Sequence, residues 1–220
     1  MPRIVVIVLA AGRSTRFAVP GAHKLLAQVG GVPVVRASVR AAVDAGVGDV
    51  LVVTGAESRL VEAEVVDLPV LVVYATDFAD GMAASLRRGV QSVRDSAAAV
   101  MIGLGDLPTM RADAYRRIAA RWHATGAPIV TPRYSGSTAP AHPTLFAASV
   151  FDELALLRGD TGARTVVSRD VARVAEEMLE WPAPRDIDTA DDLALVAEEM
   201  AAASGARVDH PVSPGPEHNR

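Results

Sequence analysis

The chain has 220 residues, of which 50% are hydrophobic, and it contains no cysteine. This length suits one domain with a sizeable core, and the missing thiols exclude disulfides, thiolate metal sites and cysteine nucleophiles, so any metal must bind oxygen or imidazole. The formal net charge is −4 and the 22 Lys and Arg residues are dispersed, so no basic footprint for nucleic acid is visible.

The first predicted element is a strand over residues 4–10, IVVIVLA. Its apolar run is far shorter than the roughly 20 residues that span a bilayer, so we expect no transmembrane helix and no membrane partner. Because Arg3 precedes the run, a secretory signal peptide is the alternative. We favour a first core strand, because an alternation of strands and helices starts here, and we expect a cytoplasmic protein, which the absence of cysteine suits.

Short β-branched runs then alternate with alanine-rich helical patterns. We expect strands over 4–10, 49–55, 69–75, 98–105 and 127–132, and helices over 34–44, 59–66, 82–93, 111–125 and 145–157. The strands lack polar alternation, which indicates a sheet covered on both faces. The pattern predicts one doubly wound α/β domain over 1–200, with a mainly parallel sheet and helices on both faces. Residues 201–220 lose this periodicity, so we expect a disordered tail there.

The loop after the first strand is the first candidate site, because ligands of such sheets bind beyond the carboxyl ends of the strands. Small residues at 10–12 leave backbone N–H groups accessible, and Arg13, Arg16 and Lys24 add three cations. The loop matches neither the P-loop pattern nor GxGxxG. We expect it to bind an anion such as a triphosphate. The alternative is a structural glycine turn with solvated arginines.

A carboxylate follows the strand expected over 98–105. Asp106 stands directly after it, and Pro108 prevents the chain from continuing there as helix or strand. Mg²⁺ usually binds one or two carboxylates plus substrate phosphates, which makes Asp106 a candidate magnesium ligand. The alternative is an N-cap for the helix expected over 111–125.

The segment RDIDTADDL holds four acids around the start of a helical pattern near Thr189, namely Asp186, Asp188, Asp191 and Asp192. Thr189 with Asp192 forms a variant capping box, so at least two of these acids are expected to be structural. Asp188 lies before the cap in a short extended segment, and it is therefore the second candidate metal ligand.

A glycine precedes the helix expected over 82–93. Gly81 stands there, and the first turn of the helix carries small side chains. Free N–H groups at such a helix N-terminus can receive an anion or the polar edge of a base. The alternative is an ordinary helix start, with Arg87 and Arg88 in solvent.

Six motifs in series resemble the MobA/MocA family of nucleotidyltransferases, and especially its molybdenum cofactor cytidylyltransferases. They are LAAGRSTRF with Lys24-Leu25-Leu26, GMAASLRRG, GDLP, HPTLF, GDTGAR and DIDTADDL, and the resemblance covers roughly residues 4–196. It implies a Rossmann-like domain of the nucleotide-diphospho-sugar transferase type. It also implies Mg²⁺-dependent transfer of a nucleotidyl group from a nucleoside triphosphate to a phosphate monoester, with release of pyrophosphate.

The same resemblance implies roles for individual residues. The residues that would bind the nucleotide are Leu9, Ala10, Ala11, Gly12, Arg13, Lys24, Gly81, Met82, Ser85 and Asp106. Those implied in catalysis are Arg13, Arg16, Lys24 and Asp106, and those implied in metal binding are Asp106 and Asp188. Those expected toward the acceptor are His142, Pro143, Asp160 and Gly162. The alternatives for this last group are a turn histidine and a helix N-cap at Asp160 or Thr161.

The substrates implied by the resemblance are CTP and the terminal phosphate of molybdopterin. Cytidylyl members typically have AAG where guanylyl members have AGG, and this chain has Ala10-Ala11-Gly12. A client molybdoenzyme would receive the product. The alternatives are a cytidylyltransferase for a sugar- or polyol-phosphate, a guanylyltransferase acting on the same pterin, and a non-catalytic cofactor carrier. No nucleic-acid partner is expected.

Overall fold

The computed structural model describes residues 2–17, 19, 22–137 and 141–205, with side chains described as far as residue 202. Most of the expected tail, residues 206–220, lies outside the described residues. The last helix, α7 (Ala190–Gly205), continues through residues 201–205, which the sequence pattern had assigned to that tail.

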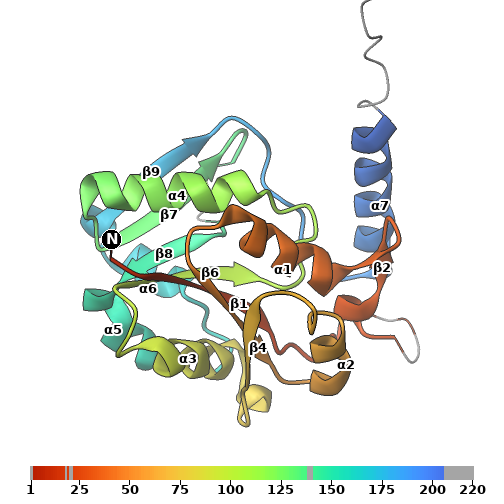
Figure 1. Cartoon of the computed structure of the whole chain (residues 1–220), viewed down its shortest axis with the longest axis horizontal. Coiled ribbons are helices and arrows are strands. Elements are labelled where there is room, and N and C mark those ends of the chain that lie inside the picture. Colours follow the sequence, from red (N-terminus) through yellow and green to blue (C-terminus); the bar gives the residue numbers. More distant parts are fainter. Residues whose placement is uncertain (1, 18, 20–21, 138–140, 206–220) are drawn as a thin grey trace, which may run out of the picture.

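Seven strands form the central sheet, in the order β5-β4-β1-β6-β8-β7-β9 (Figure 1). In chain order they are β1 (Ile4–Ala10), β4 (Asp49–Thr54), β5 (Val70–Tyr74), β6 (Ala99–Leu104), β7 (Ile129–Tyr134), β8 (Thr144–Ala147) and β9 (Val174–Leu179). β8 runs antiparallel to both of its neighbours, β6 and β7, and the other pairings in this sheet are parallel. The predicted α/β class with a mainly parallel sheet is confirmed.

Helices cover both faces of this sheet. The helices of the described residues are α1 (Val34–Ala45), α2 (Ser58–Ala63), α3 (Met82–Val93), α4 (Ala112–Thr125), α5 (Phe151–Ala155), α6 (Arg164–Arg169) and α7. Helices α1 and α4 lie together on one face, and α3 and α5 lie together on the other (Figure 1). Of the described residues, no helix is long and apolar enough to cross a membrane.

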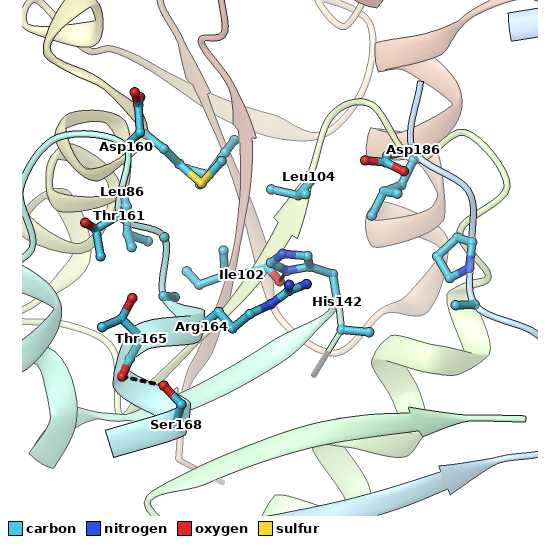
Figure 2. Close-up of a pocket in the computed structure, with 18 of the residues that line it drawn as sticks. Leu86, Ile102, Leu104, His142, Asp160, Thr161, Arg164, Thr165, Ser168 and Asp186 are labelled. Atoms are coloured by element: carbon cyan, nitrogen blue, oxygen red, sulfur yellow. Dashed lines mark hydrogen bonds between the residues drawn. The ribbon is translucent and has the colours of Figure 1, made fainter. Parts of the chain in front are cut away.

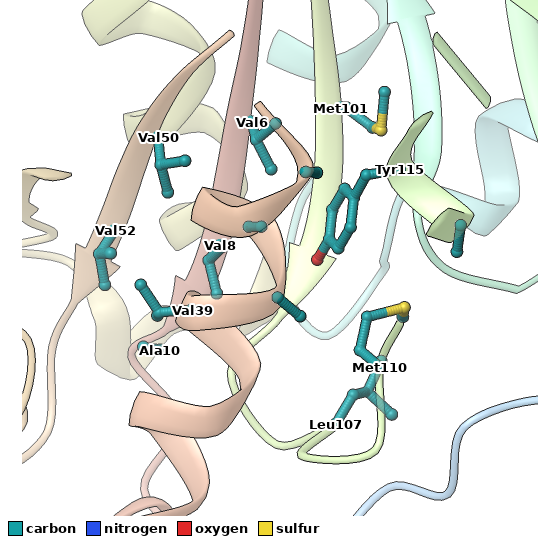
Figure 3. Close-up of a cluster of buried hydrophobic side chains, with 14 of the residues drawn as sticks. Val6, Val8, Ala10, Val39, Val50, Val52, Met101, Leu107, Met110 and Tyr115 are labelled. Carbon is teal, nitrogen blue, oxygen red and sulfur yellow. The ribbon is translucent and has the colours of Figure 1, made fainter. Parts of the chain in front are cut away.

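Successive side chains of β1 point to opposite faces of the sheet and so belong to two separate hydrophobic cores. Val6 and Val8 pack with Val39 of α1 and with Tyr115 of α4 (Figure 3), whereas Ile7 belongs to the cluster on the α3 face. Successive side chains of a strand point to opposite faces, so a strand buried on both faces is apolar throughout. Each buried valine or isoleucine contributes about 1.5–3 kcal/mol to stability, and together they fix the sheet edge that carries the site.

Two expectations about individual elements are wrong. The strand β5 is an edge strand, and Leu71 and Tyr74 are 60% and 43% exposed, although its apolar sequence indicated cover on both faces. The helix expected over 145–157 begins instead as β8, followed by a 3-10 turn over Ala148–Val150 and then α5. Pairing with β6 and β7 satisfies the backbone of this short apolar run in the sheet, which its side-chain pattern alone does not reveal.

Short elements connect the first strand to the first helix. A 3-10 turn over Lys24–Leu26 leads into a hairpin of β2 (Gln28–Val29) and β3 (Val32–Pro33). The hairpin packs against α7, and Met200 of α7 lies close to Gly30 at the tip. The segment that carries Lys24 is therefore braced by the C-terminal helix. The remaining 3-10 turns are Phe78–Asp80 and Val171–Arg173.

Candidate active site

The loops after β1 and β6 meet at the carboxyl edge of the sheet. The N–H of Gly105, which follows β6, donates to the carbonyl oxygen of Leu9 in β1 at 2.9 Å. A Cβ at position 105 would lie 3.1 Å from that same oxygen, so a glycine allows the two loops to approach closely. Asp106 is consequently held beside the end of β1.

The two predicted metal ligands lie next to each other. The N–H of Ile187 donates to the backbone oxygen of Asp106 at 3.1 Å, and this bond brings the segment before α7 to the end of β6. Asp106 and Asp188 thus face one another although they are far apart in the sequence. Their side chains are only 18% and 22% exposed, which limits the screening of their charges by water.

Two predicted cations join these acids. The ammonium nitrogen of Lys24 lies 2.7 Å from Asp106 Oδ2 and 2.8 Å from Asp188 Oδ1. The guanidinium of Arg16 lies 2.6 Å from Asp188 Oδ2. We call Arg16, Lys24, Asp106 and Asp188 the charged cluster. Its two positive and two negative charges balance.

Lys24 remains charged within this cluster. Burial by itself lowers the pKa of the ammonium, but the charge of Asp106 and the hydrogen bonds to Asp106 and Asp188 outweigh it, and the net pKa is raised. The Lys24 side chain is only 13% exposed, and the ammonium lies between the two carboxylates. A cation is therefore stable at this point of the structure.

The donor set fits Mg²⁺. Asp106 Oδ1 is buried and has no hydrogen-bond partner, so one carboxylate oxygen is available to a metal. Across the residues that the structure describes, no group of three or more His, Cys, Asp or Glu side chains is arranged to hold a metal. A metal at Asp106 and Asp188 would take its other ligands from water and substrate, as Mg²⁺ commonly does.

A cavity of about 710 Å³ lies near the charged cluster: the four cluster residues do not line it, but Leu107, next to Asp106, and Asp186, two residues before Asp188, do. It is lined by Leu9 and by residues from α3, the 158–165 loop, α6 and the segment before α7. In Figure 2, Asp160 and Thr161 lie on one side, Asp186 lies on the opposite side, and His142 and Arg164 lie between them. Four of the predicted site residues beyond Leu9 line this cavity, namely Met82, His142, Asp160 and Gly162.

The other predicted site residues do not line the cavity, Ser85 and Pro143 among them. Ser85 is buried at 5% exposure in α3, and Pro143 is buried just before β8. By contrast Asp186, for which no role was predicted, does line it.

His142 presents an uncharged ring to the cavity. Its Nδ1 lies 3.1 Å from the backbone oxygen of Ile102, and because a carbonyl only accepts, Nδ1 carries the proton. Burial lowers the pKa of the ring, although the bond to Ile102 opposes this shift. The guanidinium of Arg164 lies beside the ring (Figure 2), and its charge also lowers the pKa.

The N-terminus of α3 is covered by the 158–162 loop. The N–H of Ala83 donates to the backbone oxygen of Gly159 at 3.0 Å, so this donor is already satisfied. Gly81 has φ +105°, and a Cβ there would lie 2.4 Å from the carbonyl carbon of Gly159. The expectation of free N–H groups at this helix end is therefore met only in part. Instead, Gly81 allows the loop to lie over α3 and to place Asp160 at the cavity.

The helix-capping alternatives can also be decided. The predicted capping box is confirmed: the N–H of Thr189 donates to Asp192 Oδ2 at 2.8 Å, and the N–H of Asp192 donates to Thr189 Oγ1 at 3.2 Å. The Thr189 hydroxyl also donates to Asp192 Oδ2 at 2.7 Å, and this bond, followed by that of the Thr189 N–H, lowers the pKa of Asp192. The N-cap of α4 is Arg111, so Asp106 does not cap that helix. The N-cap of α6 is Ala163, so neither Asp160 nor Thr161 has that role.

The loop after β1 leaves two of its predicted groups open. The residue Gly12 is exposed, and no heavy atom lies within 4 Å of the position that its Cβ would take. Arg13 is exposed and forms no ion pair with the described residues. Ala10 and Ala11 are buried, at 1% and 5% exposure, and they anchor the start of the loop in the core.

Comparison with known proteins identifies the family. Residues 6–174, well over half of the chain, match the model of the MobA-like NTP transferase domain. The chain belongs to this family. The MobA-like domain is accordingly a nucleotidyltransferase.

Solved structures agree with this assignment. The Rv0371c protein of Mycobacterium tuberculosis H37Rv is 32% identical with a TM-score of 0.79, and the match covers 90% of this chain and 98% of that chain. A nucleotidyl transferase of Methanothermobacter thermautotrophicus, Mth528, is 26% identical with a TM-score of 0.77, covering 91% of this chain and 99% of that chain. A further Rv0371c structure, in complex with manganese, is 30% identical with a TM-score of 0.76, covering 89% and 98%. No curated protein matches the chain.

A further residue of the MobA-like domain was missed by the sequence patterns. His23 precedes Lys24, is only 8% exposed, and places its Nε2 2.9 Å from the backbone oxygen of Gly12. The only signal in the sequence was its position beside a predicted phosphate-binding lysine. A lone histidine among apolar residues gives no indication of which backbone group it contacts.

Proposed function

We propose that the MobA-like domain transfers CMP from CTP to the terminal phosphate of molybdenum cofactor, with Mg²⁺ as the metal and pyrophosphate as the second product. The charged cluster beside a cavity of about 710 Å³ is the observation that carries the proposal. Cations placed in this way suit a triphosphate, and small-molecule sites typically measure roughly 300–1,000 Å³. The cytoplasm stays the predicted location.

The chain's cations would bind and orient the triphosphate. The side chain of Arg16 is 75% exposed, and Arg13 is exposed as well, so both are accessible to an incoming anion. Lys24 lies deeper, between the acids, and would turn toward the phosphates when they arrive. Together the three cations reduce the repulsion between the triphosphate and an anionic acceptor.

No general base is required for this reaction. The attacking oxygen belongs to the acceptor phosphate, which is already an anion at neutral pH. As this oxygen forms its bond to the α-phosphorus, the bond from the α-phosphorus to the bridging oxygen breaks, and pyrophosphate leaves with the electron pair. Arg13, Arg16 and Lys24 stabilise the negative charge that develops on the departing group.

Asp106 and Asp188 would hold the metal. The buried, unpaired Oδ1 of Asp106 supports this assignment, as does the fit of two carboxylates to Mg²⁺. A bound Mg²⁺ supplies a positive charge and a template for phosphate oxygens. The manganese complex of the Rv0371c protein supports a divalent metal in this family.

The cavity supplies groups suited to the acceptor. Arg164 contributes a positive charge for a phosphate, and His142 contributes an uncharged ring. The choice of CTP is supported by Ala10-Ala11-Gly12, which matches the cytidylyl form of the motif. Gly81, Met82 and Ser85 would help to seat the nucleotide, Met82 directly at the cavity. Pro143, Asp160 and Gly162 would lie toward the acceptor.

Pyrophosphate release tests the proposal. The purified protein is incubated with Mg²⁺, molybdenum cofactor and each of CTP, GTP, ATP and UTP, in parallel with Asp106→Asn and Asp113→Asn. Asp106→Asn keeps the size of the side chain and removes a ligand charge, so we expect a loss of about 10²–10³ in rate. Asp113→Asn is the matched control, because this acid is 53% exposed on α4 and pairs only with surface arginines.

The outcomes separate the alternatives. Release with CTP alone that is lost in Asp106→Asn and kept in Asp113→Asn would support the proposal. Release with GTP alone would make the protein a guanylyltransferase. If molybdenum cofactor gives no release, the assay is repeated with a sugar- or polyol-phosphate in its place, and release then would change the acceptor. Binding of the pterin without any release would favour the carrier. If the proposal is supported, a client molybdoenzyme would be sought by testing whether it receives the cytidylylated cofactor from the protein.

A further inference from the structure

We propose that His23 is a positioning residue that orients the backbone of the phosphate-binding loop, residues 11–17, toward the triphosphate. The inference rests on the proposed function, because it assumes that this loop receives the phosphates of a nucleotide. His23 itself is buried behind the loop and would not touch the substrate. Its role would be carried by one hydrogen bond to the loop backbone.

The protonation of His23 follows from its partner. The ring Nε2 lies 2.9 Å from the backbone oxygen of Gly12. A carbonyl oxygen only accepts, so Nε2 must carry the proton and donate it. The other nitrogen, Nδ1, is buried and has no partner in the described structure. Thus the ring, which is 8% exposed, makes a single hydrogen bond, and this bond goes to the loop.

The bond to Gly12 fixes the direction of the next N–H. In a trans peptide the C=O of one residue and the N–H of the following residue point to opposite sides. Because the Gly12 carbonyl points toward His23, the N–H of Arg13 points away from it. Gly12 is exposed, and no heavy atom lies within 4 Å of the position that a Cβ would take there, so the loop has open space beside it. The geometry therefore presents a backbone donor to an anion.

Lys24 secures the same loop at a second point. Its N–H donates to Ser14 Oγ at 3.3 Å, and Ser14 has a left-handed φ of +54°, which non-glycine residues rarely adopt. The N–H of Phe17 donates to the backbone oxygen of Ser14 at 3.0 Å. Adjacent residues thus perform three tasks: His23 holds Gly12, the Lys24 backbone holds Ser14, and the Lys24 side chain joins the acids.

Three substitutions test the role of the Nε2–H donor. His23→Gln places an amide N–H close to the position of Nε2, whereas His23→Asn reaches only the position of Nδ1, and His23→Leu removes both. Binding of inorganic triphosphate in the presence of Mg²⁺ is measured by calorimetry, with the unfolding temperature of each variant. We expect His23→Gln to bind within about threefold of the original protein, and His23→Asn and His23→Leu to bind about tenfold more weakly.

Rescue by glutamine distinguishes positioning from simple packing. A purely structural role predicts that affinity follows the unfolding temperature in all three variants. Equal affinity in His23→Asn, His23→Leu and the original protein would overturn the inference, as would weak binding by His23→Gln with an unchanged unfolding temperature. If the original protein itself fails to bind triphosphate, the proposed function fails instead, so the two failures are distinguishable.

Discussion

Replacing Lys24 with methionine tests both the stability of the charged cluster and the position of the metal. The ammonium lies within 2.8 Å of both Asp106 and Asp188, so its removal leaves two carboxylates facing each other at low exposure. Breaking a fully buried ion pair costs about 3–5 kcal/mol, and partial exposure and the remaining partner Arg16 reduce this to about 2–3 kcal/mol. For a domain of this size we expect the unfolding temperature to fall by roughly 5–10 °C.

A divalent cation should restore part of this loss. In Lys24→Met the position between the carboxylates is open to Mg²⁺ or Mn²⁺, whereas in the original protein the ammonium competes for it. A ligand at a hundred times its Kd stabilises the folded state by about 2.7 kcal/mol. Thermal unfolding is therefore measured with chelator and with Mn²⁺, in the absence of nucleotide. The metal should stabilise the variant more than the original protein.

An exposed ion pair on the surface provides the control for this experiment. Arg94→Met removes an ion pair with Asp152 at 2.6 Å in which the two side chains are 45% and 81% exposed, so its effect should stay below about 1 kcal/mol. Equal stability of Lys24→Met and the original protein in chelator would show that the ammonium does not stabilise the charged cluster. An equal rise of both unfolding temperatures with Mn²⁺ would show that the ammonium does not occupy the metal position.

Three further variants test individual contacts. Burial holds the pKa of His142 below its ordinary value, so as the pH falls below about 6.5 the unfolded chain takes up the proton first and the folded state loses stability. His142→Gln, which lacks this group, should lose less stability between pH 7 and pH 5 in urea unfolding. An equal loss in the variant and the original protein would contradict this. Gly81→Ala should displace the Gly159 loop and raise the KM for the nucleotide. The control is Gly126→Ala, where φ is +62° but a Cβ would meet no atom within 4 Å, so this variant should only lower stability by about 1 kcal/mol. Equal KM values in the two variants would contradict a role of the loop in nucleotide binding. Asp192→Ala should lower the free energy of unfolding by about 1 kcal/mol, because α7 loses its N-terminal cap. A denaturation midpoint equal to that of the original protein would show that the cap does not stabilise the domain.

The fold was predictable from the sequence where the apolar pattern of a strand agrees with its position in the sheet. The strand β1 and the central residues of β4 and β6 are apolar and buried because helices cover both faces, so their sequence pattern indicates their burial. The same apolar pattern in β5 was misleading, because that strand lies at the sheet edge and strand order is decided by partners elsewhere in the chain. β8 was missed because a strand of four residues is too short for its sequence to be distinguished from a helix start.

The residue types of the site were predictable, but their contacts were not. Chemistry and position after a strand pointed to Asp106, and the six motifs together pointed to Lys24 and Asp188. That one ammonium would bridge both acids depends on how the last segment returns to the end of β6, which no local pattern encodes. The contact of His23 with Gly12 likewise depends on the path of the intervening loop.

The hydrogen bond between Lys24 and Asp188 joins residues 164 positions apart, and this separation has a consequence during translation. At about 5–20 residues per second, the ribosome needs roughly 8–30 s after adding Lys24 before it adds Asp188. The seven strands of the central sheet all precede Asp188 in the chain, so the sheet can pair while the Lys24–Asp106 ion pair still lacks Asp188. A nascent chain that stalls before Asp188 can therefore bury much of its core and still lack the second acid. The pair of acids is complete only when the segment before α7 has been made and Ile187 has bonded to Asp106.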